Sequence, residues 1–489
     1  MKMIFFSPSG WESWDVERPP LVRSGMPVLV DDDLLFEDGQ RPRATVAANQ
    51  WLRELPVSGA TSPNTWTVYA QALKGWLEFL AVQQVPAFGP CPELRAALGV
   101  YAEHRLAGSL EARLSESSWN LYIGVIAQFY DWAVEKGHTT AVPFTYATAK
   151  RLIGGQLTGV RRNLAKVRAP KPHTTIKYLE ADFADLFVGV LEGLLPDGTP
   201  DPRFRGHHPG RNAAMARLVR SSGLRRREFT YLLVDEVPPL PAGPTTLPIP
   251  FPVAATTAKG RKQRATWISL EALESVHRYI GLERALAVAD SAWRPDPRWG
   301  EPLVAVEPDW YSGVINGRRR AWSRLTPSER LRLVGPDGGS LLLAVQGDGS
   351  PFLDWPTVFR RAADDIRERL DPRFPHVHPH RLRHTMALAT LEDLVAGFYE
   401  QAAKLVADTD DNPALALYLT KSDPMEVLRD LLGHASVTTT QVYLSRLDTT
   451  RVFRDAYEQA GRRHGLSAAV LAEADAEFAD DETDLVGAS

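Results

Sequence analysis

The residues between positions 376 and 443 have the types and the spacing that chemistry on an anionic group requires. His380 and Arg383 are three positions apart, so on a helix they share one face and both side chains can reach one anion. A second histidine, His434, comes directly after a glycine, and Tyr443 lies nine positions further along the chain. This order of histidine, arginine and tyrosine predicts a site that acts on a phosphate group.

Exchange of a phosphodiester bond without a metal ion needs three kinds of group. It needs a nucleophile that can hold the phosphoryl group, cations on the two non-bridging oxygens, and a proton donor for the leaving oxygen. Tyr443 is the candidate nucleophile. Because a free tyrosine has a pKa of about 10, it needs a base or a strong positive potential in order to attack. Val437 and the threonines at 438–440 predict a turn or helix start that presents Tyr443.

The residues around this set make the pattern more specific. Leu431 and Leu432 precede the Gly-His pair, and Thr-Gln-Val leads into Tyr443. The ordered set, His-x-x-Arg, then Leu-Leu-Gly-His, then Tyr, resembles the C-terminal half of the tyrosine recombinase (phage integrase) family. The resemblance implies a site-specific DNA recombinase or integrase that breaks and rejoins strands through a 3′-phosphotyrosine intermediate and a Holliday junction.

The resemblance also implies partners. Double-stranded DNA with a specific recombination site is the expected substrate, held by a homo-tetramer on two such sites. Integration or excision of a mobile element is the expected role, with an accessory directionality factor as a further candidate partner. Because the covalent protein–DNA bond conserves energy, neither ATP nor a divalent metal is required, and we expect no cofactor.

The family pattern Gly-Leu-Arg-x-x-Glu assigns roles around Arg225. Gly223-Leu224 and Glu228 fix the register on Arg225, which together with Arg383 would hold the phosphate oxygens. Glu228 is expected to orient Arg225 rather than to do chemistry. The neighbouring Arg226 and Arg227 are expected to contact the DNA backbone or to lie on the surface.

A lysine and three histidines complete the set that the resemblance implies. Lys259 lies at the turn of a hairpin predicted over residues 251–270, where it would protonate the leaving 5′-oxygen. Lys262 and Arg264 compete for that role and are otherwise expected on backbone phosphates. His380 would accept the tyrosine proton or bond the phosphate. The remaining two histidines are His434, expected on a non-bridging oxygen, and His384, expected to position the helix.

The four histidines at 376, 378, 380 and 384 also suggest a zinc site. His380 and His384 have the i, i+4 spacing of such sites, but no glutamate follows the first of them as in the zincin motif. The match at Arg383 explains the cluster better, so no metal site is predicted.

Composition limits the alternatives. The 489 residues are 44% hydrophobic and 24% charged, and the single cysteine, Cys91, excludes a disulfide framework. No apolar run is long enough to cross a membrane, so a cytoplasmic, nucleoid-associated protein without membrane partners is expected. The formal net charge of −4 includes seven acidic residues after position 469, and without them the charge becomes +3. Local basic patches therefore matter more than the net charge.

The predicted fold is mainly α with a small β-hairpin or sheet (α+β). Aromatic and aliphatic residues at helical spacing, such as Trp66, Tyr69 and Leu73, predict helices whose apolar stripes pack in a core. Such a helical bundle resembles the SAM-like core-binding domain of the family. The resemblance implies that this domain and a mixed, mostly helical catalytic domain clamp DNA. The expected boundaries are 1–44 for an irregular N-terminal arm, 45–153 for the core-binding domain, 154–175 for a basic linker, 176–465 for the catalytic domain and 466–489 for an acidic tail.

The predicted linker is rich in cations. Two prolines keep it extended, and a basic connector between two DNA-encircling domains is expected to contact phosphates. Its cations are Arg161, Arg162, Lys166, Arg168 and Lys171. Within the catalytic domain, residues 285–351 are predicted to be an insertion with short elements, and extra length is expected near 396–423.

Two other functions fit parts of this pattern. A type IB topoisomerase uses the same catalytic groups but only relaxes supercoils. A catalytically silent DNA-binding regulator would have lost Tyr443 or Arg383, and both residues are present. Recombination is therefore the favoured interpretation.

Overall fold

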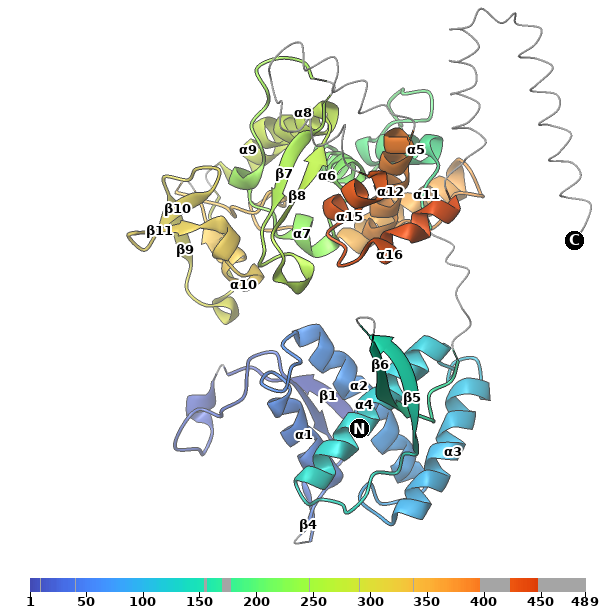
Figure 1. Ribbon diagram of the computed structural model, residues 1–489. Coiled ribbons are helices and arrows are strands. Elements are labelled where there is room, and N and C mark those ends of the chain that lie inside the picture. The colour runs from blue at the N-terminus through green and yellow to red at the C-terminus, as the bar shows by residue number, and fades with distance from the viewer. Residues whose placement is uncertain are drawn as a thin grey trace, which may run out of the picture. The chain divides into compact units, whose positions relative to one another are not determined.

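The computed structural model describes the chain as two compact units, Met1–His173 and Thr174–Ser489 (Figure 1). It describes residues 1–446 apart from 9, 40, 154–155, 169–176, 246, 290, 337 and 396–422. The predicted acidic tail at 466–489 and nearly all of the extra length expected near 396–423 lie outside the described residues. The predicted fold class, mainly α with small β elements, is confirmed.

The first unit is built on four helices. They are α1 (Ala44–Glu54), α2 (Pro63–Val82), α3 (Cys91–Ala107) and α4 (Glu116–Glu135). Their aromatic stripes are buried, as the helical spacing predicted: Trp76 and Trp119 are at most 1% exposed, and the Trp76 indole donates a hydrogen bond to the Tyr130 hydroxyl at 3.1 Å. These side chains form the core of the unit.

The N-terminal 44 residues are more regular than an irregular arm, which corrects the prediction. Strands β1 (Lys2–Phe5) and β2 (Pro27–Val30) pair antiparallel, and the Asn49 side chain on α1 exchanges two 2.8 Å hydrogen bonds with the Leu29 backbone. Burial of Leu29 in the helical core fixes the sheet in place. Three short elements complete the segment: η1 (Trp11–Ser13), β3 (Glu37–Asp38) and β4 (Arg41–Pro42).

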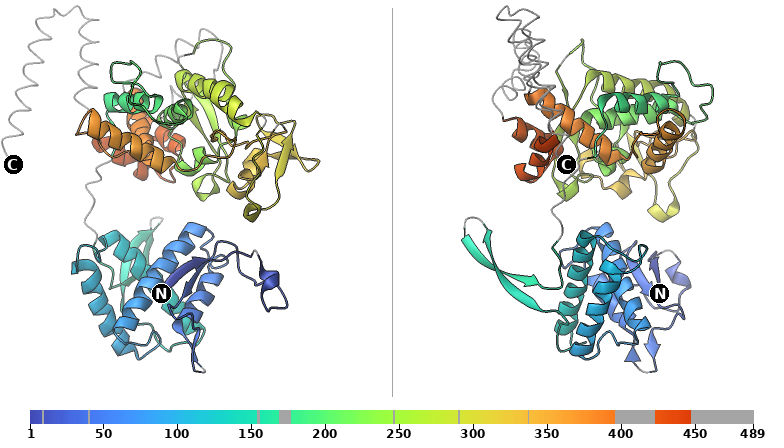
Figure 2. Two further views of the ribbon diagram at one scale, coloured as in Figure 1. Left: turned by 180° about the vertical axis from the view of Figure 1, so that it is seen from behind. Right: turned by 90° about the vertical axis from the view of Figure 1, so that its right-hand side faces the viewer.

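The predicted linker is partly a β-ribbon, which is a second correction. Strands β5 (Tyr146–Ile153) and β6 (Gln156–Asn163) pair antiparallel over their whole length and project from the helices of the first unit (Figure 2). The next segment of the chain is also held, because the Asn120 side chain on α4 exchanges two 2.9 Å hydrogen bonds with the Val167 backbone. Cross-strand pairing and these bonds replace the unstructured connector that was predicted here, whereas the part of the linker that contains the two prolines lies outside the described residues.

The second unit packs its helices around one large apolar core. The core-forming helices are α5 (Ala181–Glu192), α6 (Pro209–Ser222), α8 (Leu270–Tyr279) and α11 (Trp355–Arg369). A second cluster joins α12 (Pro379–Val395) to α15 (Pro424–Leu432) and includes Trp267 and Tyr443. No helix among the described residues is long and apolar enough to cross a membrane.

Short elements at the edge of this core carry the predicted site residues. The predicted hairpin is confirmed as β7 (Ile249–Val253) and β8 (Arg264–Ile268), with η3 (Lys259–Arg261) between them. Helix α7 (Arg226–Thr230) follows α6, and η2 (Val234–Glu236) follows α7. The tyrosine segment is α16 (Val437–Thr440) and η7 (Gln441–Arg446), as the threonine run predicted.

The predicted insertion, residues 285–351, begins with α9 (Ala285–Val288), which directly follows the helical turn η4 (Ile280–Arg284). A four-stranded sheet comes next, with strand order β11-β10-β9-β12. The strands are β9 (Leu303–Val306), β10 (Ser312–Ile315), β11 (Arg318–Ala321) and β12 (Leu333–Val334), and the helical turns are η5 (Pro297–Trp299), η6 (Trp322–Arg324) and α10 (Pro327–Arg330). The sheet covers a small core of its own.

Candidate active site

Two glycines end helices at the site. Gly223 ends α6 at φ 62° and Gly433 ends α15 at φ 60°, both in the left-handed region that favours glycine. A Cβ at Gly223 would lie 2.9 Å from the Met386 sulfur, and one at Gly433 would lie 2.6 Å from Arg264 Cδ. The Gly-Leu-Arg and Gly-His motifs therefore begin with glycine because each helix must stop sharply there.

Arg383 is buried between these two helix ends. The residue is 1% exposed, and its guanidinium donates hydrogen bonds to the carbonyls of Gly223 and Leu432. Carbonyls at helix C-termini carry partial negative charge, so they favour a cation there. Burial, and next the charge of Arg225, lower the pKa of Arg383 to about 9, which still leaves it charged at neutral pH. The side chain is thus held rigidly from two sides.

Glu228 connects two arginines. Its carboxylate accepts two 2.7 Å hydrogen bonds from Arg264, one of 3.2 Å from the Arg225 guanidinium and one of 2.7 Å from the Arg225 backbone N–H. Burial alone would raise the pKa of Glu228, but Arg264 and Arg225 lower it on balance. The expected support of Arg225 by Glu228 is present, and Arg225 also reaches the Gly433 carbonyl at 3.4 Å.

Arg264 does not lie where the sequence placed it, on DNA phosphates. Its side chain is only 8% exposed, and besides Glu228 it donates to the Leu431 carbonyl at 3.1 Å. Alternation along β8 turns this side chain inward, where the buried carboxylate needs a partner. Arg264 therefore belongs to the support of the site.

We expect Arg264→Ala to destabilise the second unit by roughly 3 kcal/mol, because it leaves Glu228 buried with only part of its pairing. Thermal unfolding of the full chain measures the effect. Lys262→Ala is the matched control on the same hairpin; because Lys262 is exposed, its loss should leave stability unchanged and weaken DNA binding in a salt-dependent way. Normal stability of Arg264→Ala together with a reduced salt dependence of binding would restore the phosphate-contact interpretation.

The Tyr443 hydroxyl contacts His384, a histidine that was expected only to position the helix. His384 Nδ1 lies 2.8 Å from the hydroxyl, whereas no hydrogen bond between His380 and Tyr443 is found among the described residues. His380, Arg383 and His384 share one face of α12, and the rings of the two histidines are 4.4 Å apart. Their shared helix face indicated that either histidine could reach the tyrosine, but spacing alone could not show which of the two contacts the hydroxyl.

Burial controls the charge of the tyrosine and its neighbours. It raises the pKa of Tyr443 to about 12, although Arg383 and Arg225 act in the opposite direction. Burial, and next the nearby His380, lower the pKa of His384 to about 4. His384 is therefore neutral at neutral pH, and with its proton on Nε2 it can accept the tyrosine hydrogen at Nδ1.

The other two histidines, His380 and His434, come from α12 and from the turn after α15. His434 Nδ1 is 3.0 Å from the Thr440 hydroxyl, which ties the Gly-His turn to α16. Burial, and next Arg383 and Arg225, lower the pKa of His434 to about 4. His380 is the more exposed, and burial followed by the charge of Arg383 also lowers its pKa.

These shifts predict how stability depends on pH. In the unfolded chain a histidine titrates near 6.5, whereas His384 and His434 in the folded chain titrate at about 4. Between these values the unfolded chain binds more protons, so the free energy of unfolding should fall as the pH drops from about 7 to 4. Melting temperatures at pH 7.5 and 5 should differ less for His384→Gln than for the unaltered chain. An equal or larger difference in the variant would contradict the assignment.

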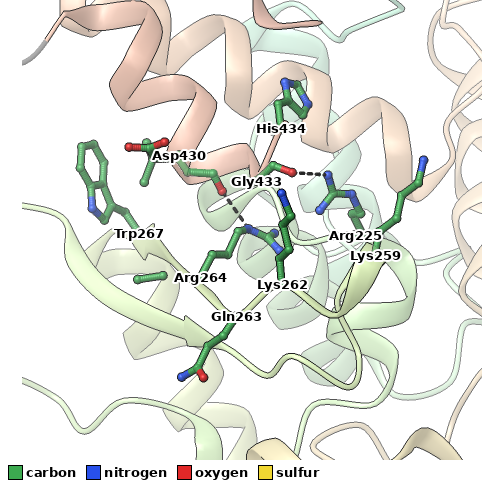
Figure 3. A pocket seen from close by; sticks show the side chains of 11 residues that line it. Arg225, Lys259, Lys262, Gln263, Arg264, Trp267, Asp430, Gly433 and His434 are labelled. Carbon is green, nitrogen blue, oxygen red and sulfur yellow. Dashed lines mark hydrogen bonds between the residues drawn. The ribbon is translucent and has the colours of Figure 1, made fainter. Parts of the chain in front are cut away.

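A cavity of about 430 Å³ opens beside these groups (Figure 3). Arg225 and His434 line it from the helix ends, while Lys259 and Lys262 reach it from the hairpin turn. Both lysines are exposed, and Lys259 lies in the turn as predicted. Tyr443 does not line this cavity, because its hydroxyl is turned towards His384 in the core. The cavity is thus a cationic pocket of the size and charge that suit a phosphate.

The remaining predicted DNA contacts lie on the surface. Arg226 and Arg227 are exposed at the start of α7. In the first unit Arg161, Arg162, Lys166 and Arg168 are exposed, and Arg161 stacks over the Tyr146 ring at 3.4 Å. Lys171 lies outside the described residues. The structure leaves these cations available to a polyanion.

Comparisons with known proteins match parts of this chain. Residues 48–137 match the family described as the phage integrase N-terminal SAM-like domain. Over 147 residues the chain is 34% identical to the tyrosine recombinase XerC of Chromohalobacter salexigens, a match that covers 30% of this chain and 38% of that protein. Residues 48–137 are therefore similar to a phage integrase domain, and 147 residues of the chain are similar to part of a tyrosine recombinase. The chain spans less than half the length of this curated relative.

Solved structures of recombinases are similar at low sequence identity. XerH bound to difH substrate in a pre-cleavage complex has a TM-score of 0.41 and 15% identity, covering 84% of this chain and 83% of XerH. The Tn1549 transposon integrase with circular intermediate DNA has a TM-score of 0.42 and 13% identity, covering 81% and 94%.

Proposed function

We propose that this chain is a tyrosine recombinase, a site-specific DNA integrase that cleaves and rejoins strands through a 3′-phosphotyrosine. The observation that carries the proposal is the meeting of Arg225, Arg383 and His434 at two helix ends, next to a tyrosine whose hydroxyl contacts a neutral histidine. Cations, nucleophile and base thus come from four separate segments into one site. Such convergence is what metal-independent phosphoryl transfer requires.

The roles follow from the contacts. The Tyr443 oxygen attacks phosphorus and gives its proton to Nδ1 of His384, while the bond from phosphorus to the 5′-oxygen breaks. Arg225, Arg383 and His434 hold the two non-bridging oxygens. Lys259 supplies the proton that the departing 5′-oxygen takes up. Rejoining runs these steps in reverse with the 5′-hydroxyl of another strand as nucleophile.

DNA contacts and assembly complete the proposal. The exposed cations of the first unit and of α7 would hold backbone phosphates, so that both units grip one duplex as a clamp. Four copies on two recombination sites would exchange strands through a Holliday junction. Movement of a mobile element, with or without a directionality factor, is the proposed outcome.

A plasmid assay tests the proposed function. Two copies of the cognate site, identified as short inverted repeats in the DNA flanking the gene, are placed on one supercoiled plasmid, and a control plasmid carries one copy. Recombination should resolve or invert the two-site plasmid and leave the one-site plasmid unrearranged. Relaxation of both plasmids without rearrangement would favour the topoisomerase alternative.

Lys259→Ala should fail because the 5′-oxygen leaves without a proton. A substrate with sulfur in place of the bridging 5′-oxygen departs as a thiolate and needs no proton. We therefore expect this substrate to restore cleavage by Lys259→Ala but not by Arg383→Ala, whose defect concerns the non-bridging oxygens. Rescue of Lys262→Ala instead of Lys259→Ala would move the acid role to Lys262, which lines the same cavity.

A further inference from the structure

The insertion between α8 and α11 is attached directly to the elements that carry the site. Arg330 of α10 is fully buried and donates to the Glu236 carboxylate, at 2.8 Å through one nitrogen, and to the Tyr231 carbonyl at 2.8 Å. Tyr231 ends α7, the helix that begins directly after Arg225. A buried, fully paired arginine makes this attachment rigid, because any displacement would unpair the carboxylate.

A second attachment reaches the lysine hairpin. The Thr256 hydroxyl, three residues before Lys259, donates to the Leu325 carbonyl at 2.7 Å. Leu325 directly follows η6 of the insertion. The insertion is therefore fixed to both the Arg225 side and the Lys259 side of the pocket, so it lies next to any duplex that is engaged there.

The outer strand of the insertion, β11, consists of three arginines and an alanine and pairs only with β10 among the described strands. Arg319 is neutralised, because it donates to Asp309 and lies within 3.8 Å of Glu307. Arg318 and Arg320 are exposed, and neither has a carboxylate partner in the described part of the chain. A strand edge with unpaired arginines is a ready site for an anion.

The pairing register places these two arginines on one side of the sheet. Arg318 is opposite Ile315 and Arg320 is opposite Gly313, so they share a sheet face with those residues. A Cβ at Gly313 would lie 2.3 Å from the Trp322 ring, which identifies this face as the one covered by η6. Arg319 points to the other face. Arg324, at the end of η6, is also exposed.

From this arrangement we propose that Arg318 and Arg320 of β11 contact the phosphate backbone of duplex DNA next to the cleaved site. The inference rests on the proposed function, since that function brings a duplex to the pocket. Phosphates suit this surface because guanidinium groups bind phosphate oxygens through paired hydrogen bonds. The two arginines are spaced along a strand edge rather than gathered in a closed site, which suits the repeated phosphates of a DNA backbone. The insertion would thereby extend the grip of the catalytic unit beyond the active-site phosphate.

The test compares the double variant Arg318→Ala/Arg320→Ala with Arg319→Ala in the full chain. Fluorescence anisotropy of a labelled duplex of about 40 base pairs gives Kd at several salt concentrations. Each lost phosphate contact lowers the slope of log Kd against log salt by about 0.9, so the double variant should lose about 2 in slope. Arg319→Ala, already neutralised by Asp309, should change the slope by less than a third of that. Unchanged melting temperatures show that the variants are folded.

The outcomes separate this inference from the proposed function. If the unaltered chain shows no salt-dependent DNA binding, the proposed function fails. If the unaltered chain binds and the double variant keeps its slope, only the β11 inference is overturned. Tighter DNA binding by the double variant would also overturn it, and would indicate that these arginines hold the acidic tail of the chain instead.

Discussion

Tyr443→Phe abolishes covalent attachment of the chain to DNA while DNA affinity stays within about twofold, if the proposed mechanism holds. Phenylalanine keeps the ring that packs in the α12–α15 core and removes only the hydroxyl that contacts His384. Leaving the His384 nitrogen unpaired costs about 1 kcal/mol, which is too little to unfold the unit. The measurement is the yield of SDS-resistant protein–DNA adduct on a nicked duplex that carries the cognate site.

Tyr101→Phe is a matched control, since the Tyr101 ring is likewise buried but lies in the first unit, outside the second unit that carries the site. It should form adduct at the normal rate. An adduct that still forms with Tyr443→Phe would show that another residue is the nucleophile. Loss of DNA binding in that variant would instead show that Tyr443 has a structural role.

The second large effect is expected from the arginines. Arg383→Lys and Arg225→Lys should each slow single-turnover cleavage at least ~100-fold, which corresponds to about 3 kcal/mol or more of transition-state stabilisation. The Arg383 guanidinium donates hydrogen bonds to the Gly223 and Leu432 carbonyls, and its remaining N–H groups can still donate to a phosphate. An ammonium group is a single point charge and cannot do both.

Arg226→Lys is the control for register. Arg226 is exposed at the first position of α7 and should change cleavage little, although it removes the same kind of group. Near-normal cleavage by Arg225→Lys combined with inactive Arg226→Lys would show that the Gly-Leu-Arg register is shifted by one residue.

Much of the site could be predicted from the sequence because its residues lie in short, rigid patterns. A glycine that ends a helix fixes the direction of the next few residues, so Arg225 after Gly223 and His434 after Gly433 could be placed without knowing the fold. Helical spacing likewise put His380 and Arg383 on one face. The hairpin turn around Lys259 was predicted from strand patterns on both sides. Each of these is local information.

The parts that could not be predicted depend on contacts between distant segments. The ion pair between Arg264 and Glu228 spans 36 positions, and nothing in the hairpin sequence distinguishes an inward arginine from one on DNA. Whether His380 or His384 contacts the tyrosine hydroxyl depends on where η7 places Tyr443 in the folded chain. Strands β5 and β6 were not predicted, because their basic residues and the glycine pair between them are typical of a linker. Pairing partners, not local propensity, decide such elements.

The shared carboxylate of Glu228 also sets the charge that the site presents to DNA. Arg225, Arg264 and Arg383 contribute three positive charges, the histidines are neutral, and Glu228 cancels one charge. A phosphodiester carries one negative charge, whereas its five-coordinate transition state carries two. The net charge of the arginine cluster, +2, therefore balances the charge of the transition state better than that of the intact phosphodiester. The cluster thus binds the transition state more tightly than the intact DNA, which lowers the activation barrier.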